Sequence, residues 1–228
     1  GLNKYGFADT KLFNPIATTR PGVYVCGAFQ GPKDIPDSVA QASGAAAKAA
    51  REIAPARGTM VTKVVHPEER DVSGEEPRVG VFVCHCGVNI GGVVGVSSVV
   101  DYAKSLPNVV FADENLYTCS QDTQEIIKEI ILEHNLNRIV VASCTPRTHE
   151  PLFRSTLKEA GLNEYLFEMA NIRDQCSWVH MHEHDKATDK SMDLVRMAVA
   201  KARLLEPLVN PIIKTTPVAL VIGGGLSG

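Results

Sequence analysis

The chain has 228 residues, a formal net charge of -3 at pH 7, 44% hydrophobic residues and 21% charged residues. This length allows one large domain or two small ones, and the composition is ordinary for a globular protein. The charge indicates no nucleic acid partner, and the apolar runs fall far short of the roughly 20 residues of a membrane span. Because no signal peptide is visible either, we expect a cytoplasmic protein without a membrane span.

The first block, residues 1–57, contains one expected strand and one expected helix. Residues 22–27 are apolar and end in glycine, which is typical of a short buried strand. After a loop rich in Gly and Pro, Asp37 or Ser38 is the expected N-cap of an alanine-rich helix that ends near Ile53. One strand and one helix are too little to bury a core. We therefore expect this block to lean on the rest of the chain, or to pair with a strand at 218–222.

Residues 58–77 are rich in Pro, Gly and charge, which is typical of a linker. Short apolar segments and amphipathic segments then alternate over residues 78–206. We expect strands at 79–83, 109–112, 138–143 and 165–169, and helices at 97–106, 122–134, 148–160 and 174–205. Repeats of this length predict an α/β fold: a mainly parallel four-stranded sheet with helices on both faces.

Five of the six cysteines lie at or after the ends of these strands. Cys84 and Cys86 follow the first strand, Cys119 the second, Cys144 the third and Cys176 the fourth. Parallel strands end at one edge of a sheet, where ligands of open α/β folds bind. Four thiolates there suit a [4Fe–4S] cluster or a zinc ion. We expect Cys84, which lies deeper in its strand and shares a face with Cys86, to be the reserve ligand.

Several alternatives for this site stay open. Any single cysteine could simply be a buried core residue. His149 could donate a hydrogen bond to sulfur or be a solvated side chain, and Arg147 and Arg173 could offset the charge of a cluster or form surface ion pairs. The domain could instead bind structural zinc for assembly, or be a thiol enzyme with Cys144 as nucleophile and His149 as base. We expect Trp178 to pack in the core beside the site.

The end of the chain carries a glycine motif. The apolar segment 218–222 precedes Gly223, Gly225 and Gly228, which match G-x-G-x-x-G in the strand context that dinucleotide binding requires. The helix that would hold the phosphates lies beyond the given sequence. We therefore expect that this chain alone does not retain a dinucleotide.

Four segments closely resemble the N-terminal domain of the A-type subunit family of heterodisulfide reductase. They are 83–89 (VCHCGVN), 115–120 (NLYTCS), 142–151 (ASCTPRTHEP) and 169–178 (MANIRDQCSW). Segment 19–35 (TRPGVYVCGAFQGPKDI) resembles the closing FAD-contacting strand and loop of the same family. The resemblance implies FAD contacts at Gly27, Ala28, Asp34 and Ile35, although related flavoproteins carry Asp where Ala28 stands.

This resemblance implies a domain order. Residues 1–57 would be the end of one flavin module, 78–206 the iron–sulfur domain, and 207–228 a linker and the start of a second flavin module. The chain would then be an internal piece of a longer tandem protein and inactive alone. The family partners with other reductase subunits, ferredoxin, and a hydrogenase or formate dehydrogenase. In methanogens it acts on the coenzyme M–coenzyme B heterodisulfide at a site on a different polypeptide, so no catalytic residue is assigned here.

Overall fold

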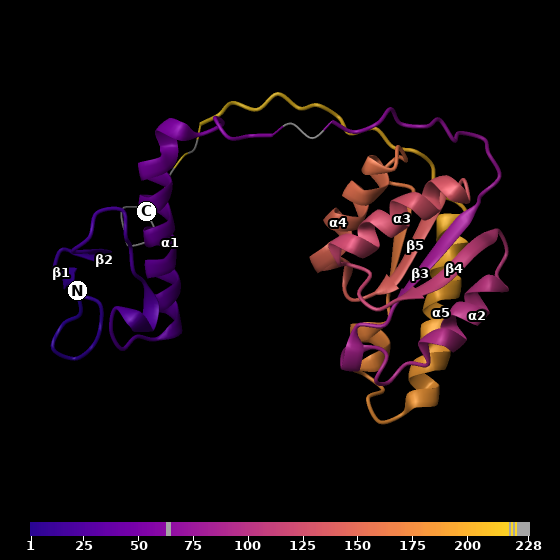
Figure 1. Cartoon of the computed structure of the whole chain (residues 1–228), viewed down its shortest axis with the longest axis horizontal. Helices are drawn as coiled ribbons and strands as arrows, with labels where there is room; N and C mark the ends of the chain where they lie inside the picture. Colours follow the sequence, from indigo (N-terminus) through magenta and orange to yellow (C-terminus); the bar gives the residue numbers. More distant parts are fainter. Residues whose placement is uncertain (63–64, 219, 221, 223–228) are drawn as a thin grey trace. The chain divides into compact units, whose positions relative to one another are not determined.

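The computed structural model describes residues 1–62, 65–218, 220 and 222. The chain forms two compact units, one made of residues 1–64 with 213–228 and the other of residues 65–212 (Figure 1). No helix among the described residues is long and apolar enough to cross a lipid bilayer.

The unit of residues 65–212 is built on the expected four-stranded parallel sheet. Its strands are β3 (Val79–Cys84), β4 (Val109–Asn115), β5 (Arg138–Ser143) and β6 (Phe167–Asn171). They lie in the order β4-β3-β5-β6, and every neighbouring pair is parallel. The two central strands, β3 and β5, are buried at each position, which explains why their sequences are almost continuously apolar.

Helices cover both faces of this sheet (Figure 1). They are α2 (Val96–Lys104), α3 (Gln121–Glu133), α4 (Pro146–Glu159) and α5 (His184–Ala202). One core layer joins Val99 of α2 and Val195 of α5 to the sheet. The other joins Ile127 of α3 and Phe153 of α4 to Phe82. The predicted α/β class, with a parallel sheet between two helical layers, is confirmed.

The expected helix 174–205 is interrupted. The chain first forms a short π-helical turn, Arg173–Ser177, and α5 begins only at His184. Within the turn, the Ser177 amide donates to the Ile172 carbonyl at 3.0 Å and the Trp178 amide donates to Arg173 at 2.9 Å, five residues back in each case. This wider winding is not part of a regular 3.6-residue period, so an amphipathic pattern does not reveal it.

The unit that contains the N-terminus holds a hairpin, β1 (Thr10–Lys11) with β2 (Asn14–Thr18), and the helix α1 (Ile35–Ile53). The predicted cap of α1 is wrong. Its N-cap is Asp34, whose carboxylate accepts a hydrogen bond from the Asp37 amide at 2.8 Å. Pro36 then occupies the first turn, where the missing proline amide costs nothing.

The expected strand at 22–27 does not form, because only Tyr24 makes an isolated bridge, to Ala17. Val218, Leu220 and Ile222 of the expected strand 218–222 are exposed and lie outside any strand. Residues 219 and 221, like Gly223, Gly225 and Gly228 of the glycine motif, lie outside the described residues.

Candidate functional site

The carboxyl edge of the parallel sheet carries five cysteines. Cys84 is the last residue of β3 and Cys86 lies two residues further on. Cys119 follows β4, Cys144 directly follows β5, and Cys176 lies in the π-helical turn after β6. The four strands therefore deliver a cysteine each to one edge of the sheet, as their parallel arrangement requires.

Four of these thiols act on one another electrostatically. Burial raises the pKa of the Cys86 thiol, and the neighbouring Cys84, Cys144 and Cys119 raise it further. Burial also raises the pKa of Cys119, with a further contribution from Cys84. The pKa of Cys144 is raised by burial and, to a smaller extent, by Cys119 and Cys84. We call Cys84, Cys86, Cys119 and Cys144 the four-thiol group.

Cys176 differs from this group. Its side chain is fully buried, and it belongs to the core layer under α2 and α5. Burial raises the pKa of the Cys176 thiol, and Ser191 and Lys190 of α5 offset part of this rise. None of the other five cysteines contributes to the shift. Cys84, the expected reserve ligand, thus interacts with the other thiols, whereas Cys176 is more secluded. The ligand set stays a prediction.

The loop after β3 is shaped by backbone geometry. Cys86 has a φ of 41°, in the left-handed region, so the alternation that would place it on the same face as Cys84 does not continue beyond the strand. The His85 amide donates to the Asn115 carbonyl at 2.8 Å, which keeps the loop beside the end of β4. The His85 ring lies against Gly91, where an added Cβ would be 2.1 Å from the ring. Any larger residue here requires the His85 ring or the loop to move.

Positive potential reaches the thiols from two sources. Arg173 lowers the pKa of both Cys86 and Cys144. It also pairs with Asp174 at 3.3 Å and lies 4.7 Å from the centre of the Trp178 ring. The ion pair considered for Arg173 is therefore present, whereas its role in offsetting the charge of a cluster stays a prediction. Trp178 is 47% exposed, so its predicted place in the core is wrong.

Helix ends provide the second source. Cys119 precedes Ser120, the N-cap of α3, and Cys144 precedes Thr145, the N-cap of α4. The positive end of a helix stabilises a thiolate near it. Even so, burial raises the pKa of the Cys144 thiol overall. His149 is partly buried and is not among the groups that shift this pKa.

Buried polar atoms without partners gather near the cysteines. Five of the eight such atoms among the described residues are His85 Nδ1, Asn115 Oδ1, Thr118 Oγ1, Ser143 Oγ and Ser177 Oγ; the other three are the Nε atoms of Arg70, Arg138 and Arg154. Buried polar atoms normally have a hydrogen-bond partner. Four of the five can donate, and the sulfurs of an iron–sulfur cluster accept hydrogen bonds. Soft thiol ligands with unused donors beside them fit a thiolate-ligated cluster.

No group of three or more His, Cys, Asp or Glu side chains is already placed to hold a metal ion within residues 1–62, 65–218, 220 and 222. A single zinc ion needs sulfurs only about 3.8 Å apart, as four Zn–S bonds of about 2.3 Å dictate. The cysteine sulfurs that bind a [4Fe–4S] cluster lie farther from one another, roughly 6 to 7 Å apart.

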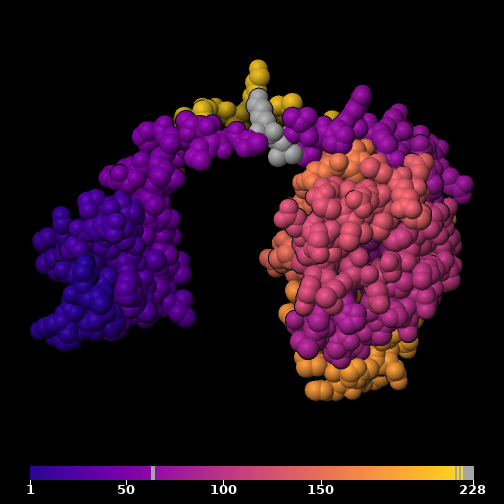
Figure 2. Space-filling model, in the orientation of Figure 1, coloured from indigo at the N-terminus to yellow at the C-terminus, as the bar shows by residue number. Residues whose placement is uncertain are grey.

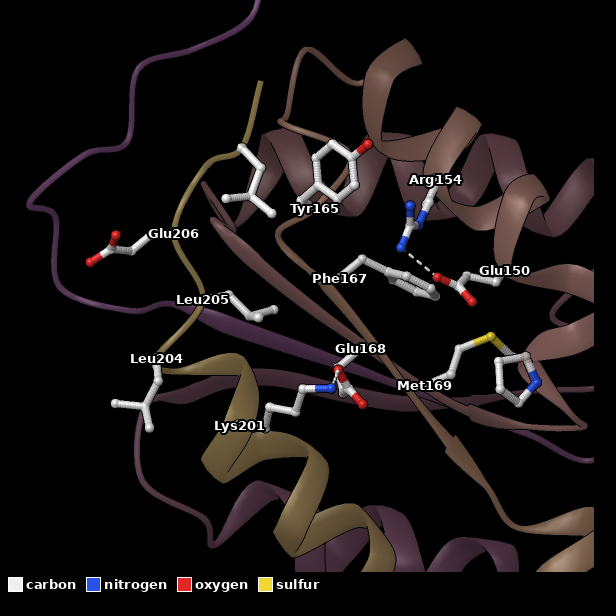
Figure 3. Close-up of a pocket in the computed structure, with 12 residues that line it drawn as sticks. Glu150, Arg154, Tyr165, Phe167, Glu168, Met169, Lys201, Leu204, Leu205 and Glu206 are labelled. Carbon is white, nitrogen blue, oxygen red and sulfur yellow. Dashed lines mark ion pairs between the residues drawn. The ribbon is translucent and has the colours of Figure 1, made fainter. Parts of the chain in front are cut away.

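A separate hollow of about 520 Å³ borders β6 and contains none of the cysteines (Figure 3). Its two cations are already paired: Arg154 with Glu150 at 2.5 Å and Lys201 with Glu168 at 2.7 Å. Figure 2 shows magenta and orange segments side by side at one end of the same unit. The Gly95 amide donates a hydrogen bond to the Thr188 hydroxyl at 2.9 Å. The cysteines therefore lie outside this hollow, at the carboxyl edge of the sheet.

The residues expected to contact FAD gather near the start of α1. Gly27 has a φ of 65°, which favours glycine, and its amide donates to Gln41 of α1 at 3.0 Å. Ala28 is exposed, and Ile35, the first residue of α1, is 81% exposed. The Asp34 carboxylate is engaged as the helix cap. A role in FAD binding remains a prediction for these four residues.

The chain is similar to several known proteins, although no family model matches it. It is 62% identical over 154 residues to the second A-type iron–sulfur subunit of the CoB–CoM heterodisulfide reductase of Methanopyrus kandleri, a match that covers 68% of this chain and 24% of that protein. It is 58% identical over 161 residues to the A-type subunit of the H2:CoB–CoM heterodisulfide,ferredoxin reductase of Methanothermobacter thermautotrophicus. This match covers 71% of this chain and 24% of that protein. It is 56% identical over 154 residues to a protein of Archaeoglobus profundus described as like the A-type subunit of heterodisulfide reductase, covering 68% and 22%. The chain thus spans about a quarter of the length of these relatives.

Proposed function

Over the residues that it shares with these relatives, this chain belongs to the A-type subunit family of heterodisulfide reductase, and we propose that its α/β unit is an iron–sulfur electron-transfer segment of a larger flavoprotein oxidoreductase. The observation that carries the proposal is the delivery of a cysteine by each of four parallel strands to one edge of the sheet. The unpartnered polar atoms beside these cysteines support it.

The proposed ligands of a [4Fe–4S] cluster are Cys86, Cys119, Cys144 and Cys176, with Cys84 in reserve. When bound, such a cluster supplies a one-electron carrier. The protein's part is to hold the thiolates and to offset their charge. Arg173, which lowers the pKa of Cys86 and Cys144, and the helix ends that follow Cys119 and Cys144 suit this task.

The wider electron path is proposed for the full-length protein. Electrons would pass between the cluster and FAD, toward a disulfide or ferredoxin acceptor. FAD would be held by Gly223, Gly225 and Gly228 in one module and by Gly27, Ala28, Asp34 and Ile35 in the other. The names of two relatives support a heterodisulfide as acceptor. Ferredoxin is named beside the heterodisulfide as reduced in one of them, whereas the other is called ferredoxin-dependent. Other reductase subunits, and a hydrogenase or formate dehydrogenase, are the proposed partners in the cytoplasm.

The test is anaerobic reconstitution of the full chain with iron and sulfide. We expect about four iron and four acid-labile sulfide per chain, with broad absorption near 400 nm (about the range for thiolate-ligated clusters). Metal analysis by mass spectrometry distinguishes the zinc alternative. A colourless protein with about one tightly bound zinc and no sulfide would contradict the proposal.

A further inference from the structure

The buried hydroxyl groups of the α/β unit fall into two classes. Three have hydrogen-bond partners and lie inside helices: Thr123 accepts from Ser120 at 3.0 Å, Thr156 donates to Leu152 at 3.0 Å, and Ser191 donates to Ala187 at 2.7 Å. The other three buried hydroxyls of the described residues have no partner. These are Thr118, Ser143 and Ser177.

The unpartnered hydroxyls are those next to cysteines. Thr118 precedes Cys119, Ser143 precedes Cys144, and Ser177 follows Cys176. Each of the three residues is at most 2% exposed, so water is not freely available to them. Leaving a buried hydroxyl unpaired costs about 1–3 kcal/mol, a cost that a protein normally avoids. The three unpaired hydroxyls each lie beside a cysteine, whereas the buried hydroxyls inside helices are all paired. This difference indicates a hydrogen-bond acceptor at the carboxyl edge of the sheet, near the cysteines.

The main chain at the three hydroxyl residues has hydrogen bonds of its own. Thr118 uses its carbonyl to accept a hydrogen bond from Gln124. The Ser143 carbonyl accepts from the Ile172 amide at 2.9 Å, and the Ser177 amide donates to the Ile172 carbonyl at 3.0 Å. The main chain of these residues is thus fixed by its own hydrogen bonds. Their hydroxyl groups, which have no part in these bonds, are left to serve another group.

We propose that Thr118, Ser143 and Ser177 are positioning residues that donate hydrogen bonds to the sulfurs of the cluster and thereby set its reduction potential. The proposal deepens the proposed function and rests on it. One-electron reduction adds a negative charge to the cluster, and a donor stabilises the more negative state more strongly. Removing a donor should therefore lower the midpoint potential.

Ser143 is the best donor to test first, because it ends the central strand β5 and directly precedes Cys144. The experiment is a redox titration of the reconstituted full chain, followed by the electron paramagnetic resonance signal of the reduced cluster. We expect Ser143→Ala to keep the wild-type iron content, to titrate at a lower potential and to shift the Fe–S stretching frequencies in resonance Raman spectra. Ser155→Ala is the control, because the Ser155 hydroxyl already donates a hydrogen bond to Glu159 on α4 at 3.1 Å. The cluster of this variant should have the same midpoint potential as that of the wild type.

Thr118→Val and Ser177→Ala repeat the measurement at the other two positions. If Ser143→Ala does not take up a cluster, these two variants decide the matter. The inference is overturned if the variants that load a cluster titrate at the wild-type potential. That result would leave the proposed function intact, whereas a wild-type chain that assembles no cluster would overturn the proposed function itself.

Discussion

Two helices of equal length show how differently the two units of this protein are built. Helix α1 and helix α5 each have 19 residues. None of the residues of α1, all of them described, is buried, whereas six residues of α5 are. The buried residues of α5 are Ala187, Ser191, Val195, Ala198, Val199 and Ala202.

The two units also differ in burial outside these helices. Among the described residues of the unit that contains α1, the only buried apolar side chains are Ala8 and Val25. The α/β unit has an apolar layer on each face of its sheet. Most helical stability in proteins comes from packing an amphipathic face. Helix α1 has an N-cap but no buried residue, whereas the α/β unit has a core that can hold a site rigid.

The largest loss of stability should come from removing a large side chain from the core of the α/β unit. Phe82 is fully buried, and its ring lies 5.6 Å from that of Phe111. Phe82→Ala should lower the free energy of unfolding by about 3–5 kcal/mol, measured by urea titration with circular dichroism. The matched control, Phe29→Ala, removes a ring that is 62% exposed and should change stability by less than about 0.5 kcal/mol. Equal losses in the two variants would show that the contrast between the units is wrong.

A smaller effect should follow from a methyl group added beside the four-thiol group. Gly91→Ala places a Cβ 2.1 Å from the His85 ring, so the ring or the loop must move. We expect a loss of about 1–3 kcal/mol, as for other overpacked sites. At Gly31, in the other unit, a Cβ has nothing within 4 Å, so Gly31→Ala is the control. Equal stability of Gly91→Ala and wild type would disprove the close packing of His85 on Gly91.

The smallest effect concerns pH. Lys128 of α3 and Glu159 of α4 form an ion pair at 3.0 Å, and the hydrogen bond from Lys128 is the main cause that lowers the pKa of Glu159. A lowered pKa in the folded state stabilises the fold above the unfolded value, near 4.5, and this contribution is lost as the pH falls through the folded pKa. Because Glu159 is 39% exposed and screened by solvent, we expect at most about 1 kcal/mol.

Glu159→Gln should remove this contribution. The unfolding free energy of this variant should lie below that of the wild type at pH 7, and the two should converge as the pH falls through the lowered pKa of Glu159. Glu129→Gln, at an exposed position of α3, is the control and should follow the wild-type curve. If the unfolding free energies of Glu159→Gln and the wild type differed by the same amount from pH 7 to pH 3, ionisation of Glu159 would not be the origin of the difference.

The sequence predicted the α/β unit better than its site. Strand β5 begins and ends where the apolar run 138–143 predicts, and the position of each cysteine after a strand follows from topology alone. The break before α5 was missed because it depends on hydrogen bonds five residues apart around Cys176. The free hydroxyls were also missed. A Thr or Ser beside each of three cysteines is visible in the sequence, but only the fold shows that Ser191 has a partner and Ser143 has none.

The central claim is that the cysteines at the carboxyl edge of the sheet hold a cluster, and a pair of matched variants tests it most directly. Cys144 lies at that edge, whereas Cys26 belongs to the other unit. After anaerobic reconstitution, we expect Cys26→Ala to contain about four iron and four sulfide per chain, like the wild type, and Cys144→Ala to lose the cluster. Equal iron and sulfide in Cys144→Ala and wild type, or loss of the cluster in Cys26→Ala, would contradict the account.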